Sequence, residues 1–174
     1  KFDAASLTQN TGKKRYAPIN GGFNIAAGYK GFSLAADFAY VLGKYLTNND
    51  AYFYDNAAQF LGYNQRKDVT DYWTVDNKDA KYPNWAKGYQ MQFDTHLLEN
   101  ASFLRLKNFQ LGYLFDQKLL GFQNVVQTVK LTFTARNLFT ITGYKGLDPE
   151  INSNVVLGRV GNTKQFLFGV ELTF

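Results

Sequence analysis

Apolar and polar residues alternate along several stretches of this chain. One stretch runs from residue 22 to 29 and a second from 32 to 43. In the first, the apolar positions are Phe23, Ile25, Ala27 and Tyr29. In the second, they are Phe32, Leu34, Ala36, Phe38, Tyr40 and Leu42. Because successive side chains of a β-strand point to opposite faces, this period of two predicts two strands, each with an apolar face and a polar or small-residue face.

Lys30 and Gly31 separate these two predicted strands. If they form a two-residue hairpin turn, Tyr29 lies opposite Phe32 and every further apolar residue lies opposite another. The further pairs are Ala27 with Leu34, Ile25 with Ala36 and Phe23 with Phe38. A slip by one residue would destroy this match, so the pattern also predicts the register. Lys is less favourable than Asn or Asp at the first turn position, which leaves the turn type open.

Three more strands are predicted by the same alternation. They run from 101 to 115, from about 126 to 138, and from 163 to 174. Short connections at 30–31 and 116–125 alternate with long ones at 44–100 and 140–162. In an up-and-down meander, this order puts the short turns on one rim and the long loops on the other, as in outer-membrane barrels with long extracellular loops.

The pattern favours an all-β fold that this chain cannot complete alone. Closing a barrel takes about eight strands, and five are predicted here. We therefore interpret residues 1–174 as the C-terminal part of a larger transmembrane antiparallel β-barrel. A soluble β-sandwich, whose strands also alternate, is the alternative. The barrel is favoured because the polar faces are rich in Gly, Ala, Ser and Thr, while Tyr and Phe mark the strand ends.

Composition narrows the classes of function. The chain has 174 residues, 45% hydrophobic and 17% aromatic, which excludes wholesale disorder. The absence of Cys excludes disulfides, thiol catalysis and cysteine-ligated metals. No stretch approaches the roughly 18 uncharged apolar residues of a membrane helix. The first residue is Lys1 and no signal peptide follows it, so we expect a mature or truncated piece.

Candidate chemistry is sparse. His96 is the single histidine and has no nucleophile beside it in the sequence. No phosphate-binding loop is present, and a net charge of +5 without a motif is a weak indication of nucleic-acid binding. Asp148 and Glu150 offer two carboxylates for calcium, but a turn with solvated acids is the simpler interpretation. We expect no enzyme, no cofactor, no metal site and no nucleic-acid partner.

Four segments carry more specific motifs. They are residues 71–83 (DYWTVDNKDAKYP), 99–113, 136–150 and 166–174. In this order and spacing they resemble the C-terminal end of the SusC/RagA family, the TonB-dependent outer-membrane transporters of Bacteroidetes.

The resemblance implies a plugged barrel of about 22 strands. It implies TonB-dependent uptake of a large nutrient, a glycan or a peptide, and location in the outer membrane. The implied partners are a SusD-like surface lipoprotein, TonB through an N-terminal region outside this chain, the rest of the barrel, and outer-membrane lipid and lipopolysaccharide. The competing hypothesis is a soluble β-sandwich module that binds carbohydrate with its aromatic loop.

Three groups of residues are candidates for function. The last strand would present to the barrel-assembly machinery one face made of Phe166, Phe168, Val170, Leu172 and Phe174. The polar faces assigned to the lumen carry Asp37, Lys130 and Arg136, which would line the solute path or pair across strands. Aromatic rings amid amides suit a partner or substrate surface, and the candidates are Tyr72, Trp73, Tyr82, Trp85 and Tyr144. The alternative for these rings is a small core of the loop itself.

Overall fold

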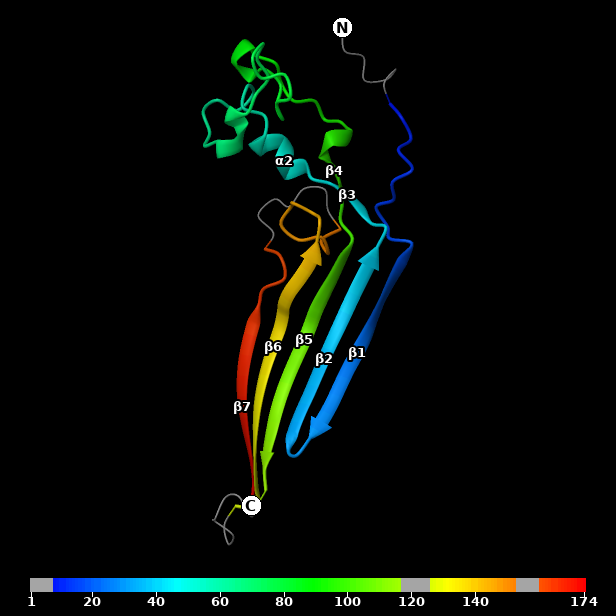
Figure 1. The fold of residues 1–174 in the computed structure, drawn as a ribbon, viewed down its shortest axis with the longest axis vertical. Helices are drawn as coiled ribbons and strands as arrows, with labels where there is room; N and C mark the ends of the chain where they lie inside the picture. Colours follow the sequence, from blue (N-terminus) through cyan, green and yellow to red (C-terminus); the bar gives the residue numbers. More distant parts are fainter. Residues whose placement is uncertain (1–7, 117–125, 153–159) are drawn as a thin grey trace. The chain divides into compact units, whose positions relative to one another are not determined.

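The computed structural model describes residues 8–116, 126–152 and 160–174, and their five long strands form one antiparallel sheet (Figure 1). Its strands are β1 (Ile19–Tyr29), β2 (Phe32–Leu42), β5 (Phe103–Phe115), β6 (Thr128–Thr142) and β7 (Gln165–Thr173). The order across the sheet is β1-β2-β5-β6-β7, so each long strand pairs with the next long strand in the sequence. The predicted all-β antiparallel class is therefore confirmed.

The chain divides into two compact units. The first, the sheet unit, comprises residues 17–43, 102–142 and 160–174. The second, the loop unit, comprises residues 1–16, 44–101 and 143–159. No helix among the described residues is long and apolar enough to cross a membrane.

The loop unit consists of short elements. β3 (Tyr45–Thr47) pairs antiparallel with β4 (Leu98–Asn100) and brings together the two ends of a long insertion. Between them lie the α-helix α2 (Asn49–Tyr54) and the 3₁₀ turns η1 (Lys67–Thr70), η2 (Trp85–Lys87) and η3 (Thr95–Leu97). The side chains of Asn48, Asn84 and Asp94 cap α2, η2 and η3 respectively. Asx side chains favour such caps because they accept the unpaired N–H groups of the first turn.

The hairpin between β1 and β2 has the predicted register. Tyr29 pairs with Phe32 and Phe23 with Phe38, whose rings stack at 4.7 Å between centroids. Lys30 and Gly31 have φ values of 45° and 86°. Positive φ at both central residues is the signature of a type I′ turn, whose twist matches that of the strands. The structure thus decides the turn type that the sequence left open.

The end predicted for the fourth strand is wrong. β6 continues to Thr142 rather than stopping at 138, because the ladder continues past an irregularity. On β5, Lys107 is an extra residue relative to β2. On β6, Asn137 and Leu138 together lie opposite Lys107, and Asn137 takes a φ of 50°. Asn tolerates this left-handed conformation, so the strand bulges and goes on.

The apolar face of the sheet is exposed in this chain. Every residue of β1 and β7 is exposed, and Phe168 reaches 83%. Neighbouring strands align apolar rows on this face, for example Phe133 of β6 with Phe168 of β7, whose ring centroids are 5.0 Å apart. An apolar face of this extent must be covered by something outside the chain, because soluble proteins rarely leave contiguous apolar patches open.

We predict that Gly31→Val destabilises the full-length protein by about 2 kcal/mol. A left-handed conformation costs a residue with a Cβ roughly 1–2 kcal/mol. The new Cβ would also lie 2.9 Å from the carbonyl oxygen of Leu114. Gly28→Ala is the matched control, because its Cβ would meet its nearest atom, the Phe32 carbonyl oxygen, at 3.6 Å. The measurement is urea unfolding in detergent, and equal losses in the two variants would contradict the prediction.

Candidate functional site

One row of polar residues crosses all five strands of the sheet. In order across the sheet it is Asn24, Asp37, Asn108, Arg136 and Gln165, each in register with the next. We call these five residues the polar row. Neighbouring strands lie about 4.8 Å apart, so the row is a line of hydrogen-bonding groups on one face of the sheet. It lies at the level of the bulges in β5 and β6.

Asp37 and Arg136, the two charged residues of the polar row, differ in their hydrogen bonding. The carboxylate of Asp37 accepts hydrogen bonds from Asn24 Nδ2 at 2.6 Å and from Asn108 Nδ2 at 3.1 Å, one at each oxygen. Arg136 is exposed, and within the described part of the chain it has no hydrogen-bond or ion-pair partner. Amide donors therefore satisfy the carboxylate of Asp37, while the described residues leave the guanidinium of Arg136 without a partner.

The structure brings Asp37 and Arg136, two of the predicted lumen residues, into this row. Their placement toward a lumen stays a prediction. Sequence reasoning missed Asn24, Asn108 and Gln165 as members of the row. Their polarity was visible, but the register between β2 and β5 depends on a bulge that no local signal announces.

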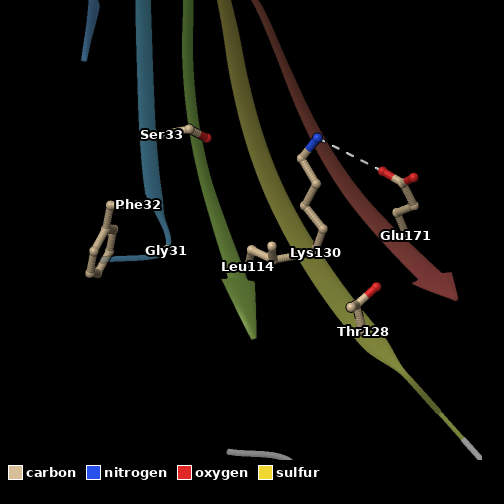
Figure 2. A pocket seen from close by; sticks show the side chains of 7 residues that line it. All are labelled: Gly31, Phe32, Ser33, Leu114, Thr128, Lys130 and Glu171. Atoms are coloured by element: carbon tan, nitrogen blue, oxygen red, sulfur yellow. Dashed lines mark ion pairs between the residues drawn. The ribbon is translucent and has the colours of Figure 1, made fainter. Parts of the chain in front are cut away.

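The third predicted lumen residue, Lys130, lies beside a hollow on the polar face (Figure 2). The hollow has a volume of about 420 Å³. It is lined by Gly31, Phe32, Ser33, Leu114, Thr128, Lys130 and Glu171. Lys130 Nζ lies 3.9 Å from Glu171 Oε2 on the neighbouring strand. Lys130 is therefore paired across strands, and such an exposed pair contributes about 0–1 kcal/mol.

The loop unit has a small core of its own. Ala57, Val69 and Tyr82 are buried. Tyr72, Trp85 and Met91 pack against them, and Trp85 Nε1 donates to the carbonyl oxygen of Val69 at 2.8 Å. A loop of this length is stabilised by the packing of its own side chains. The rings of Tyr72, Tyr82 and Trp85 thus pack inside the loop.

A charged network surrounds the hydroxyl of Tyr82. Lys81 Nζ lies 2.7 Å from Asp68 Oδ2, and the Tyr82 hydroxyl lies 3.0 Å from the same oxygen. Arg66 also pairs with Asp68, at 3.0 Å. The hydrogen bond from Lys81 lowers the pKa of the Asp68 carboxyl below its ordinary value, and the same bond raises the pKa of Lys81. The network therefore favours the charged forms of both residues.

A second cluster in the loop unit contains Tyr144. Its ring is buried with Leu46 and Ala101. Burial, together with the nearby carboxylates of Glu99 and Asp50, raises the pKa of the Tyr144 hydroxyl to about 12. Tyr144 therefore stays neutral and acts as a packing residue at physiological pH.

The side chain of Lys44 reaches the acidic turn at 148–150. Its side chain is buried, and Lys44 Nζ donates to the carbonyl oxygen of Pro149 at 2.5 Å. Burial lowers the pKa of Lys44, and the carboxylates of Glu150 and Asp148 oppose that shift. Among the described residues, no group of three or more acidic, His or Cys side chains could hold a metal ion. The ammonium group of Lys44 lies against this turn.

Of the five aromatic candidates, Trp73 is the most exposed, at 41%, whereas Tyr82 is 3% and Tyr144 8% exposed. We therefore assign Tyr82 and Tyr144 to the cores of the loop unit rather than to direct contact with a partner. Other rings of the loop unit are more exposed, namely Phe53, Tyr54, Tyr63, Tyr89 and Phe93. No local signal distinguishes the two sets, because burial depends on how the insertion folds back on itself.

The predicted assembly-signal residues share the apolar face of β7. Phe166, Phe168, Val170 and Leu172 lie opposite Ala135, Phe133, Leu131 and Val129 of β6. Phe174 follows the last strand residue and is exposed. Recognition of this face by the barrel-assembly machinery stays a prediction.

Comparisons with known proteins identify relatives of this sheet. No family model matches the chain. The TonB-dependent receptor P3 of Formosa agariphila is 28% identical over 165 residues, covering 88% of this chain and 16% of that protein. The TonB-dependent receptor SusC of Bacteroides thetaiotaomicron is 38% identical over 81 residues, covering 45% of this chain and 8% of that protein.

Solved structures match over the whole chain. A chain of the RagAB peptide importer in the closed-closed state is 45% identical, with a TM-score of 0.88, covering 100% of this chain and 19% of that one. The open-open state of the same importer gives 44% identity and a TM-score of 0.83. In sequence and in fold, the chain resembles part of the TonB-dependent transporters SusC and RagAB. As its four motifs predict, the chain resembles one part of much longer proteins, and it spans less than a fifth of each of these relatives.

We predict that acid opens the loop unit through Asp68. Because the pKa of Asp68 is lowered in the folded state, its contribution to stability is present above the ordinary value of 3.8. It is lost as the pH falls through the lowered folded value. Hydrogen exchange of residues 48–97 in the full-length protein, corrected for the intrinsic pH dependence, measures this opening. Asp68→Asn should raise exchange at neutral pH and weaken its acid dependence.

Asp76→Asn is the control for this experiment, since Asp76 is an exposed acid of the same loop. It should leave both the neutral exchange and the acid dependence unchanged. If both variants behaved like the unsubstituted protein, the Asp68 network would have no part in stabilising the loop.

Proposed function

We propose that the full-length protein imports a large nutrient across the outer membrane in a TonB-dependent manner. The observation that carries this proposal is the match of the entire chain to the RagAB peptide importer at 45% identity. In this proposal the sheet unit forms part of the barrel wall and pairs through its outer strands with the missing strands. The loop unit forms part of the extracellular surface, and the chain has no catalytic role.

The nutrient we favour is a peptide. The peptide importer matches the whole chain, whereas the SusC match covers 45% of it. A glycan is the second candidate, supported by the SusC relative and by aromatic rings amid amides in the loop unit. The β-sandwich carbohydrate-binding module is less well supported, because the match to the importer includes all five strands.

The partners follow from the same proposal. A SusD-like lipoprotein would dock on the exposed rings of the loop unit, because exposed aromatic side chains supply large contact area at low entropy cost. Outer-membrane lipid would cover the apolar face of the sheet. TonB would act through the part of the protein outside this chain. Lipopolysaccharide would meet the outer rim of the barrel wall.

Fractionation and uptake test this function. We expect the full-length protein in the detergent-extracted outer membrane of its native host, co-purifying with a lipoprotein. Uptake of a fluorescein-labelled peptide mixture should fall to background when either this protein or TonB is deleted. A soluble full-length protein, or peptide and glycan uptake unaffected by both deletions, would contradict the proposal.

A pair of neighbouring residues on opposite faces tests the orientation of the sheet. Phe168 lies on the apolar face and Leu167 on the polar face, in register with Thr134. An arginine on the lipid-facing side of a barrel costs about 2–4 kcal/mol near the bilayer midplane. We expect Phe168→Arg to reduce the outer-membrane level severalfold on a quantitative blot. Leu167→Arg should have little effect. A stronger loss from Leu167→Arg would reverse the assigned faces.

A further inference from the structure

Arg136 is an unusual member of the polar row. Its side chain is exposed, and the described residues supply it with neither a hydrogen bond nor an ion pair. A guanidinium carries five N–H donors in a planar fork and stays charged at any physiological pH. The row therefore contains a fixed positive charge with all its donors available.

The other charges on this face have partners. Asp37 lies two strands away and is held by the two amides described above. Lys130 pairs with Glu171. Arg105, which is in register with Ala39 on the polar face, is buried and donates from Nε to Thr140 Oγ1 at 2.8 Å. Asp37, Lys130 and Arg105 thus each have a hydrogen-bond or ion-pair partner among the described residues, whereas Arg136 has none.

The backbone next to Arg136 is held in place. The following residue, Asn137, has a φ of 50°, and its Nδ2 donates to the carbonyl oxygen of Thr163 at 3.1 Å. Arg136 is also the last paired residue before the register between β5 and β6 shifts. Bulges re-aim a side chain and are common next to functional sites. The bulge and the side-chain hydrogen bond of Asn137 therefore fix the backbone position from which Arg136 projects.

Amide side chains flank Arg136 on both sides. Asn108 is its partner on β5 and Gln165 its partner on β7. Each amide offers a donor and an acceptor, which matches the N–H and C=O groups of a peptide. The guanidinium between them matches a carboxylate, which it binds through two parallel hydrogen bonds. The site is therefore chemically complementary to the C-terminal carboxylate of a peptide or to an acidic side chain.

We propose that Arg136 is a solute-binding residue that takes a carboxylate of the peptide in transit, with the amides of Asn108 and Gln165 on either side. This inference rests on the proposed function, which turns the polar face toward the solute path and favours a peptide. It goes further by naming the contact and the charge that the wall recognises.

The test compares two forms of one probe in cells that carry the full-length protein. The probe is a mixture of peptides of neutral sequence with an uncharged BODIPY dye on the N-terminus, prepared once as free acids and once as C-terminal amides. We expect Arg136→Gln to lower the ratio of free-acid to amide uptake about tenfold, since one charge-assisted hydrogen-bonding partner is lost. Amide uptake and the outer-membrane level should be unchanged. Arg136→Lys should restore part of the ratio.

Lys87→Gln is the control, because it removes the same charge from an exposed position in the loop unit. It should leave the ratio as in the unsubstituted protein. A third probe, with one internal Glu in an amidated peptide, identifies the source of the carboxylate. If Arg136→Gln lowers uptake of this third probe, the site binds acidic side chains. If Arg136→Gln lowers only the uptake of the free acids, the site binds the C-terminal carboxylate of the peptide.

Other outcomes overturn the inference. An unchanged ratio in Arg136→Gln, together with unchanged uptake of the Glu-containing amide, would show that Arg136 does not contact a carboxylate. An equal loss of both probe forms would assign Arg136 to a contact with the rest of the protein. In either case, uptake that still depends on TonB would leave the proposed function intact. Uptake independent of TonB in the unsubstituted protein would instead contradict the proposed function itself.

Discussion

The backbone ladder of the five-stranded sheet is the constraint on which the rest of the structure depends. Because side chains alternate across a strand, each ladder pair places apolar residues on one face and polar residues on the other. The sheet thereby gains an apolar face that this chain leaves exposed and a polar face that carries the polar row. The proposed place of this sheet in a transporter barrel accounts for both faces, since lipid would cover the first and solute would meet the second.

The loop unit is stabilised by contacts of its own. A long insertion between paired strands stays folded in water only if its own side chains pack together. Tyr82 meets this need with an apolar ring in the core and a hydroxyl that joins the Lys81 and Asp68 network. Lys44 also links two segments of the loop unit, because its buried ammonium group donates a hydrogen bond to the carbonyl oxygen of Pro149 in the acidic turn. Rings that suggest a binding surface in the sequence are, in part, the core of the loop unit.

Local pattern predicted a good part of the fold. The β1–β2 register was predictable because two residues connect the strands and every apolar residue has an apolar partner. The bulges at Lys107 and Asn137 were not predictable, since an extra residue in one strand has meaning only relative to its neighbour. For the same reason, Asp37 and Arg136 were recognised as polar-face residues, but their alignment in one row was not.

By itself, the sequence determined the strand alternation, the two faces of the sheet and the resemblance to SusC/RagA transporters, because these depend on residues close together in the chain and on ordered motifs. The tertiary structure alone decided which rings of the long insertion are buried, which charges are neutralised, and which polar residues stand side by side. These properties arise from contacts between segments far apart in sequence. Asn24, Arg136 and Gln165 lie on three different strands, and only the register of the folded sheet places them in one line.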